Sequence, residues 1–219
     1  MAAFGRIVVI LVLLTIKYPN WGKMDKERIC EALVNANVVR FGDFTLVSGQ
    51  KSPIYIDLRV LPSYPKSFDA ISGEMAKLIK DLNPDLVAGI ESAGIPLATA
   101  VALKNKAPMI YIRKKPKDYG TKSRIEGLLR ENEKVVLIDD LITDGGSKVK
   151  SLEAIREVGA RIEDIVVVLD REQGGEDTML QHKCRLHAMV TLKDLLAYME
   201  KKNFISHEQY ARVLSYIEG

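Results

Sequence analysis

One segment concentrates residues that could bind a ligand: Asp139-Asp140-Leu141-Ile142-Thr143-Asp144-Gly145-Gly146-Ser147. Its two glycines allow backbone N–H groups to turn inward at the start of a helix, which binds phosphate without a lysine. Its two leading carboxylates accept hydrogen bonds from hydroxyl groups. The segment therefore predicts a ligand that carries both hydroxyls and a phosphate, and a ribose 5-phosphate fits this description.

An ordinary strand-to-helix connection is the alternative interpretation, because acids and a Gly-Gly turn also occur in such connections. The compression of acids, hydroxyls and glycines into one short segment favours a binding site. The segment is not a P-loop, because no Gly-Lys-Ser/Thr closes it, and the chain lacks the Gly-x-Gly-x-x-Gly pattern of dinucleotide sites.

A strand and a helix must hold this segment in place. The apolar run 134–138 predicts a buried parallel strand before it, and residues 146–158 predict a helix after it. The same reasoning predicts helices at 25–38, 65–82, from 95 onward, 176–182, 192–202 and 206–217, strands at 44–47, 54–58, 85–90, 108–112, 165–169 and 185–190, and a loop at 113–127. This order predicts an α/β fold, a parallel sheet flanked by helices on both faces, with a small N-terminal cap.

Ligands of such sheets bind at the carboxyl ends of the strands. Four polar features follow predicted strands and are therefore expected at one edge: Glu91-Ser92-Ala93-Gly94, Arg113-Lys114, Asp139-Asp140 and Asp170-Arg171. The second feature begins a basic run that is either a solvated loop or a site for a strongly anionic small molecule. This run contains Arg113, Lys114, Lys115, Lys117, Lys122 and Arg124.

Composition narrows the class of protein. A chain of 219 residues that is 47% apolar suits one α/β domain. The net charge of +3, with both signs mixed, gives no broad basic face for nucleic acid. Cys30 and Cys184 lie far apart without metal-ligand spacing, so we expect reduced core thiols, which suit a cytoplasmic enzyme. The three histidines show no catalytic or metal-binding spacing either, and we expect them to be incidental.

The N-terminal segment is apolar from Ile7 to Ile16. This run is too short for a comfortable membrane span, and no small-residue cleavage site follows it. Met24 stands just before the first predicted helix. We therefore expect residues 1–23 to be a dispensable extension or an over-called start, with no membrane association, and residues 24–219 to be the functional domain, with a cap mainly at 24–62.

The segment 135–147 resembles the signature of the type I phosphoribosyltransferases, which bind phosphoribosyl pyrophosphate (PRPP). Further segments narrow the resemblance to the orotate phosphoribosyltransferase family: Phe41–Gly49 with Ser52-Pro53 and Tyr55, Arg113–Gly120, Leu169–Gly175 and Thr191–Leu195. The resemblance covers residues 25–202. It implies transfer of ribose 5-phosphate from PRPP to orotate, which gives orotidine 5'-monophosphate and pyrophosphate in pyrimidine biosynthesis.

The resemblance also implies a role for each matching residue. It implies that Asp139 and Asp140 bind the ribose hydroxyls and that Thr143–Ser147 bind the 5-phosphate. It implies that Thr143 and Arg171 bind orotate and that the turn Ser48–Tyr55 closes over the base. The residues implied to bind PRPP are Arg113, Lys114, Lys117, Tyr119 and Asp139–Ser147, and those implied to be catalytic are Lys117, Asp139 and Asp140. A homodimer follows from the resemblance as well, with the loop at 113–120 reaching the neighbouring subunit's site.

Elementary chemistry agrees with these roles. The ribose becomes cationic in the transition state, as in glycoside hydrolysis, and nearby carboxylates stabilise that charge. Pyrophosphate is strongly anionic, so Lys and Arg side chains and Mg²⁺ are expected to neutralise it. The ion would be held mainly by substrate, so no metal site made by the protein is expected. The planar guanidinium of Arg171 suits the orotate carboxylate.

The chain departs from many bacterial members of the family: Tyr119 stands where they have His, Ser92-Ala93 where they have Tyr-Lys, and Val47 where they have Lys. Three alternative functions stay open. A purine phosphoribosyltransferase is opposed by Arg171 and the Ser48–Tyr55 turn. A PRPP-sensing regulator that binds nucleic acid would need a broad basic face, and a dehydrogenase would need the glycine fingerprint.

Overall fold

A six-stranded sheet organises the molecule. Its strands are β3 (Leu86–Ile90), β4 (Met109–Ile112), β5 (Ile125–Glu126), β6 (Lys134–Ile142), β7 (Arg161–Asp170) and β8 (Arg185–Thr191), in the spatial order β5-β4-β3-β6-β7-β8. All neighbours are parallel except β5, which pairs antiparallel with β4 at one edge. The structure is a computed structural model, and it describes residues 24–45, 49, 51–116 and 123–218.

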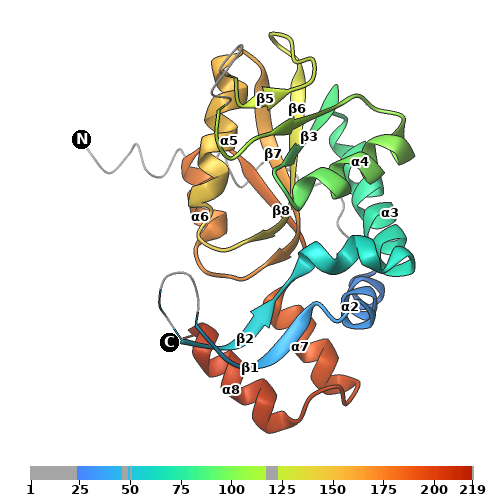
Figure 1. The fold of residues 1–219 in the computed structure, drawn as a ribbon, viewed down its shortest axis with the longest axis vertical. Coiled ribbons are helices and arrows are strands. Elements are labelled where there is room, and N and C mark those ends of the chain that lie inside the picture. The colour runs from blue at the N-terminus through green and yellow to red at the C-terminus, as the bar shows by residue number, and fades with distance from the viewer. Residues whose placement is uncertain (1–23, 46–48, 50, 117–122, 219) are drawn as a thin grey trace, which may run out of the picture.

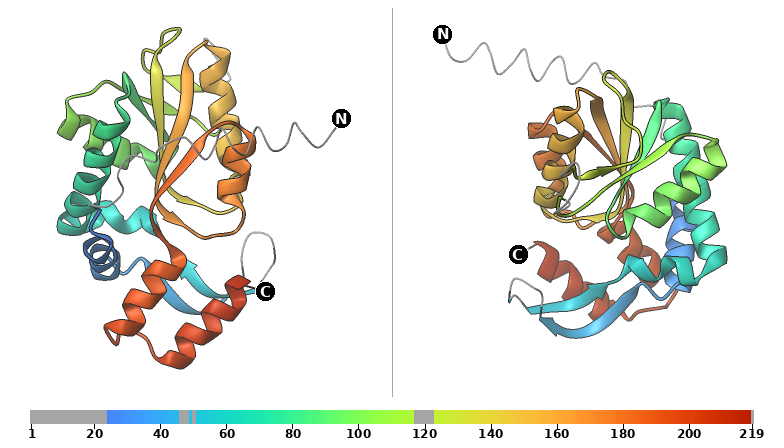
Figure 2. Two further views of the ribbon diagram at one scale, coloured as in Figure 1. Left: turned by 180° about the vertical axis from the view of Figure 1, so that it is seen from behind. Right: turned by 45° about the horizontal axis from the view of Figure 1, so that its top comes forward.

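Helices cover both faces of this sheet. On one face lie α3 (Pro65–Leu82) and α4 (Gly94–Asn105), and on the other lie α5 (Gly146–Glu157) and α6 (Gly175–Gln181) (Figures 1 and 2). The strands alternate between the two resulting cores: Val136 and Ile138 pack on the first, whereas Val135 and Leu137 pack on the second. A strand buried on both faces must be apolar throughout, which explains the continuous run before Asp139. The predicted α/β fold class is confirmed.

The two ends of the described chain meet below the sheet. The N-terminal part forms α2 (Lys26–Asn35), the hairpin of β1 (Val39–Thr45) and β2 (Lys51–Ile56), and the 3₁₀ helix η1 (Leu58–Ser63). The C-terminal part forms α7 (Leu192–Lys201) and α8 (His207–Glu218), and α8 packs on β2 (Figure 1). An ion pair of 2.7 Å joins Arg212 on α8 to Asp43 on β1. The division into an extension, a cap and a main domain stays a prediction, and residues 1–23 lie outside the described residues.

Several predicted boundaries were wrong. The first helix ends at Asn35 and not at 38, because a strand begins at Val39. That strand starts five residues before the predicted one at 44, since an irregularity between Phe41 and Phe44 interrupts the alternation that marks a strand. The loop predicted at 113–127 contains β5, which is too short to show a pattern. The part of the predicted strand 44–47 beyond Thr45 lies outside the described residues.

The most consequential difference is the length of β6. The prediction ended this strand at Ile138, before the acid pair, but β6 continues to Ile142. The long neighbour β7 pairs with it in parallel as far as Asp170, opposite Ile142. Polar residues can continue a strand when the backbone hydrogen bonds of a neighbour hold them. The two acids are therefore fixed by the sheet and do not belong to a flexible loop.

Gly94 fixes how closely α4 approaches β6. A Cβ atom at this position would lie 2.4 Å from the carbonyl oxygen of Ile138, a distance that backbone atoms cannot accept. We expect Gly94→Ala to push α4 away and to lower the free energy of unfolding by about 1–3 kcal/mol, as overpacked cores do. Urea unfolding followed by circular dichroism measures this change.

Gly73→Ala is the matched control. Gly73 also lies in a helix, α3, but a Cβ atom there would meet nothing within 4 Å. The added methyl group is expected to raise stability by up to about 1 kcal/mol, because alanine favours helices over glycine. Equal effects of the two substitutions would contradict the close approach at Gly94.

Candidate active site

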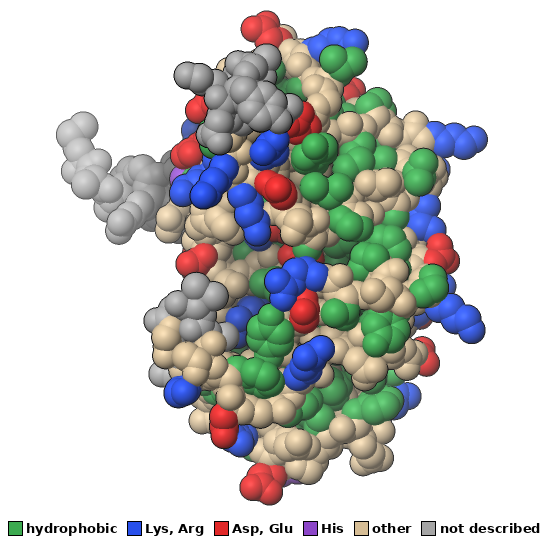
Figure 3. All heavy atoms as spheres, viewed as in Figure 1, with side chains coloured by type: hydrophobic (Ala, Val, Ile, Leu, Met, Phe, Trp, Pro, Cys, Tyr) green, Lys and Arg blue, Asp and Glu red, His purple; other side chains and the backbone are tan. Residues whose placement is uncertain are grey.

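A polar cavity of about 280 Å³ opens at the carboxyl edge of the sheet. Residues from η1 and from the ends of β3, β4 and β6 meet there with the first turns of α5. The cavity is lined by Arg59, Ile90, Glu91, Ser92, Ala93, Arg113, Lys114, Arg124, Asp139, Asp140, Ser147, Lys148 and Ser151. Lys and Arg side chains gather above and below the middle of the face shown in Figure 3, with acidic side chains among them. The lining suits an anionic ligand that also carries hydroxyl groups.

The two acids of β6 have different surroundings. Asp139 is only 5% exposed, and its carboxylate forms an ion pair with the ammonium of Lys148 on α5, which is 8% exposed. Asp140 is half-buried and accepts a hydrogen bond of 2.8 Å from the N–H of Leu141. The two carboxylates line the same cavity but differ in burial and in their partners. Asp140 is thus the acid more open to a ligand.

Burial is the main influence on the charge of Asp139. Removing a carboxylate from water raises its pKa, and the neighbouring Asp140 carboxylate acts in the same direction. The Lys148 ammonium opposes both effects and lowers the pKa of Asp139. Burial acts most strongly, so the pKa of Asp139 lies above its usual range, and Lys148 is the neighbour that favours its charged form.

The segment after β6 turns sharply into α5. Gly145 caps this helix with φ at +82°, a left-handed conformation that glycine adopts without strain. A Cβ atom there would also lie 3.1 Å from the Cβ atom of Thr178 on α6. The N–H of Gly146 donates to the Asp144 carboxylate at 3.0 Å, which holds the turn. The first turn of α5, including Ser147, then presents its N-terminal end toward the cavity.

The cations at the end of β4 are positioned by hydrogen bonds. Glu91 accepts from the N–H of Lys114 at 2.8 Å, which ties the end of β3 to the end of β4. Arg124 donates to the carbonyl oxygens of Arg113 and Lys114, both at 3.1 Å. Arg113 lies 3.3 Å from Glu126, and its buried Nε has no hydrogen-bond partner among the described residues. These contacts fix the start of the basic segment, whereas Lys117 and Tyr119 lie outside the described residues.

Arg171 follows β7 and lies beside the end of β6. Its N–H donates to the carbonyl oxygen of Ile142 at 3.0 Å. Its side-chain Nε is buried, and no described residue accepts from it. Buried donors are normally paired, so this nitrogen is an exception among the described residues.

The structure brings together only part of the predicted site. Five of the predicted residues line the cavity, namely Arg113, Lys114, Asp139, Asp140 and Ser147. The predicted residues that do not line it are Leu141, Ile142, Thr143, Asp144, Gly145, Gly146 and Arg171. The side chain of Ile142 is fully buried in the core, so only its backbone is available for a ligand.

Two cations that line the cavity, Arg59 and Lys148, were missed by sequence analysis, whereas Arg124 was named there as part of the basic run. Lys148 occupies the same helix face as the buried residues Ser151 and Leu152, three and four positions later. A lysine at an inward-facing position requires a buried anion. This pattern could have indicated that Lys148 pairs with Asp139. Arg59 lies in η1, an element that was not predicted.

No group of three or more His, Cys, Asp or Glu side chains suitable for a metal ion occurs in the described part of the chain. Within the same residues, no helix combines the length and apolar character that crossing a membrane requires. Both cysteines are buried free thiols, as expected.

The ion pair between Asp139 and Lys148 yields a stability test. Lys148→Met leaves a buried carboxylate without its cation, and we expect a loss of about 3–5 kcal/mol in the free energy of unfolding. The unpaired Asp139 then has a higher pKa in the folded than in the unfolded state. Its folded state gains a proton at low pH, so the stability of the variant should fall as pH rises from about 5.5 to about 8.

Urea unfolding at both pH values measures this dependence. The double variant Asp139→Asn/Lys148→Met is the control, since it removes both charges and should recover part of the lost stability. A single variant with wild-type stability at the higher pH would contradict the ion pair.

Comparisons with known proteins agree with this geometry. Residues 61–185 match the model of the phosphoribosyl transferase domain. The chain is 40% identical to the orotate phosphoribosyltransferase of Methanosarcina mazei, over 80% of this chain and 93% of that protein. The solved orotate phosphoribosyltransferase of Aeropyrum pernix superposes with a TM-score of 0.71 at 31% identity, over 81% of this chain and 99% of that one. The UMP synthase of Leishmania donovani gives a TM-score of 0.80 at 36% identity, over 89% of this chain but 42% of that one. This chain belongs to the orotate phosphoribosyltransferases of the type I phosphoribosyltransferase family.

Proposed function

We propose that the cavity at the carboxyl edge of the sheet is the active site for transfer of ribose 5-phosphate from PRPP to orotate. The family reaction forms orotidine 5'-monophosphate and pyrophosphate in pyrimidine biosynthesis. The observation that carries the placement is the meeting, in one cavity, of the acid pair, the N-terminal turn of α5 and the cations that follow β4. Each of these matches one part of PRPP.

The sugar and its 5-phosphate are assigned to β6 and the turn that follows it. Asp140 accepts hydrogen bonds from the ribose hydroxyls, and the buried Asp139 supports it from the adjacent position. Backbone N–H groups between Thr143 and Ser147 bind the 5-phosphate at the start of α5. The ion pair with Lys148 supports this assignment, because two unpaired carboxylates would repel an anionic substrate.

The leaving pyrophosphate is assigned to Arg113 and Lys114, together with Lys117 and Tyr119 in the segment that follows. Bidentate and charge-assisted hydrogen bonds to phosphate oxygens are strongest with such cations. They stabilise negative charge that develops as the bond to the anomeric carbon breaks. The ribose ring becomes positive in the same step, and Asp140 lies where its carboxylate stabilises that charge.

Orotate is assigned to Arg171 and Thr143, beside the turn Ser48–Tyr55. The unpaired buried Nε of Arg171 supports this role, since a planar guanidinium matches the orotate carboxylate. A ring nitrogen of orotate then attacks the anomeric carbon as pyrophosphate leaves. The part of the turn from 46 to 48, and residue 50, lie outside the described residues.

Mg²⁺ is the proposed cofactor. The acids that line the cavity are Glu91, Asp139 and Asp140, and Asp139 is already occupied by Lys148. Two remaining carboxylates fit an ion held mainly by substrate and water, which is how Mg²⁺ commonly binds phosphates. When bound, the ion neutralises charge on the pyrophosphate.

We also propose a cytoplasmic homodimer that exchanges the segment 113–120 between sites. The buried free thiols support a reducing compartment. The proposed partners are orotate and PRPP, and nucleic acid is not among them.

The direct test of function is an absorbance assay with PRPP, Mg²⁺ and orotate, in which adenine and hypoxanthine replace orotate in parallel reactions. Consumption of orotate is expected. Turnover with a purine and not with orotate would overturn the assignment of the base.

Asp140→Asn tests the sugar assignment in the same assay. We expect kcat/KM for PRPP to fall roughly a hundredfold, because the carboxylate acts on both the bound sugar and the cationic transition state. Asp81→Asn is the control, since Asp81 is an exposed acid near the end of α3 that leads to the opposite edge of the sheet. Unchanged kinetics of the Asp140 variant would mean that this acid is structural.

Mixing two inactive variants tests the exchanged segment. Lys117→Ala is expected to lose turnover while the fold stays intact, because only charge at the leaving group is removed. In a mixed dimer with Asp140→Asn, one site receives an intact acid and an intact lysine. Random exchange should therefore restore about a quarter of wild-type activity. Absence of any recovery, despite mixed dimers shown by native mass spectrometry, would contradict an exchanged loop.

A further inference from the structure

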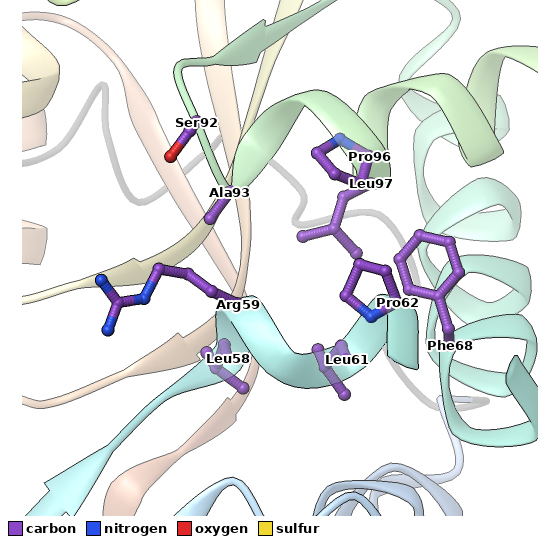
Figure 4. Close-up of a pocket in the computed structure, with 9 residues that line it drawn as sticks. All are labelled: Leu58, Arg59, Leu61, Pro62, Phe68, Ser92, Ala93, Pro96 and Leu97. Carbon is purple, nitrogen blue, oxygen red and sulfur yellow. The ribbon is translucent and has the colours of Figure 1, made fainter. Parts of the chain in front are cut away.

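Arg59 is the one cavity-lining cation that comes from the cap side of the described site. It is the second residue of η1, shortly after the end of β2, whereas Arg113, Lys114 and Arg124 come from the region around β4 and β5. Its side chain is 59% exposed. Arg59 lines both the polar cavity and a smaller neighbouring cavity of about 180 Å³, which is drawn in Figure 4.

The guanidinium of Arg59 is held in a fixed orientation. Its Nε donates to the carboxylate of Asp57 at 2.7 Å, and one terminal nitrogen donates to the hydroxyl of Tyr55 at 2.8 Å. Asp57 also accepts from the backbone N–H of Arg59 at 3.2 Å, which caps η1. The hydrogen bond from Arg59 is the largest cause that lowers the pKa of Asp57. The second terminal nitrogen has no hydrogen-bond partner among the described residues, so a donor stays available at a preset position.

The neighbouring turn after β3 contains no cation. Its residues Glu91, Ser92, Ala93 and Gly94 provide one acid and one hydroxyl, and the first three line the polar cavity. Figure 4 shows the Ser92 hydroxyl and the Arg59 guanidinium extending to the same side, away from Pro62, Leu97 and Phe68. An anion bound along this turn would therefore find its positive charge on Arg59.

Most cations of the cavity already have partners within the protein, and Arg59 with Asp57 is one of them. Lys148 is paired with Asp139, and Arg124 donates to the carbonyl oxygens of Arg113 and Lys114. Arg113 is close to Glu126. A diphosphate carries several negative charges and exposes oxygens on more than one side, so cations on one wall alone leave part of that charge unneutralised.

We propose that Arg59 binds the diphosphate of PRPP from the η1 side of the cavity, in addition to Arg113 and Lys114, and supplies there the positive charge that the turn Glu91–Gly94 lacks. The inference rests on the proposed placement of PRPP in this cavity. Orotate is the less favoured ligand, because Arg171, its candidate partner, does not line the cavity. Arg59 would contact the diphosphate of the substrate and also pyrophosphate as the product.

Binding of pyrophosphate with Mg²⁺ to the full-length enzyme, measured by titration calorimetry, tests this role without turnover. Arg59→Ala should raise the Kd for pyrophosphate roughly tenfold to a hundredfold, as expected for the loss of charge-assisted hydrogen bonds. Arg59→Lys should recover part of the affinity, because it restores charge without the planar fork. Arg212→Ala removes the same charge from the exposed surface of α8 and should leave the Kd unchanged. Thermal melting checks that each variant is folded.

Kinetics identify the ligand. The KM for PRPP is expected to rise in Arg59→Ala, while the KM for orotate stays within about twofold of wild type. An unchanged Kd for pyrophosphate, or a rise confined to the KM for orotate, would overturn the proposal. Lys114→Ala separates this failure from failure of the site itself: if it weakens pyrophosphate binding and Arg59→Ala does not, only the role of Arg59 is wrong. If neither does, the placement of PRPP is wrong.

Discussion

The buried ion pair between Asp139 and Lys148 is the interaction on which the rest of the site depends. Asp139 lies within β6 and Lys148 within the first turn of α5, on either side of the connection between them, and both are almost fully buried. Their contact therefore joins β6 directly to α5 and helps to fix where α5 begins relative to the end of the strand. Without it, the turn at Gly145 and the N-terminal end of α5 would have no fixed relation to Asp140.

This pair also sets the charge of the site. Two adjacent carboxylates next to a phosphate-binding turn would repel the phosphate, and the Lys148 ammonium against Asp139 reduces that repulsion. Asp140 is the more open of the two acids and lies beside the region assigned to the sugar. Positive charge is placed around the rim of the cavity, on Arg59, Arg113 and Lys114. The separation matches a reaction in which the sugar becomes positive as a polyanion leaves.

Close packing brings these groups together. Gly94 lets α4 begin against the carbonyl oxygen of Ile138, which keeps the turn after β3 next to the acid pair. Glu91 in that turn then holds the backbone of Lys114 after β4. Parallel strands place all three features at one edge, and the hydrogen bonds between them remove the freedom that separate loops would have.

Composition and pattern were sufficient for the class of fold and for the chemistry of the ligand. Apolar runs followed by polar residues are local properties, so the α/β sheet, its carboxyl edge and the group of Asp139, Asp140 and Ser147 were predictable from the sequence. Contacts between distant residues were not predictable from the sequence. The extension of β6 through the acids depends on pairing with β7. Arg59 reaches the cavity from a 3₁₀ helix whose residues carry no regular pattern. The unequal roles of the two acids are also tertiary, because only the folded chain buries Asp139 against Lys148 and leaves Asp140 accessible. The sequence by itself determined which chemical groups are present at this edge, and the tertiary structure decided which of them are charged, paired and open to a ligand, because burial and ion pairing exist only after folding.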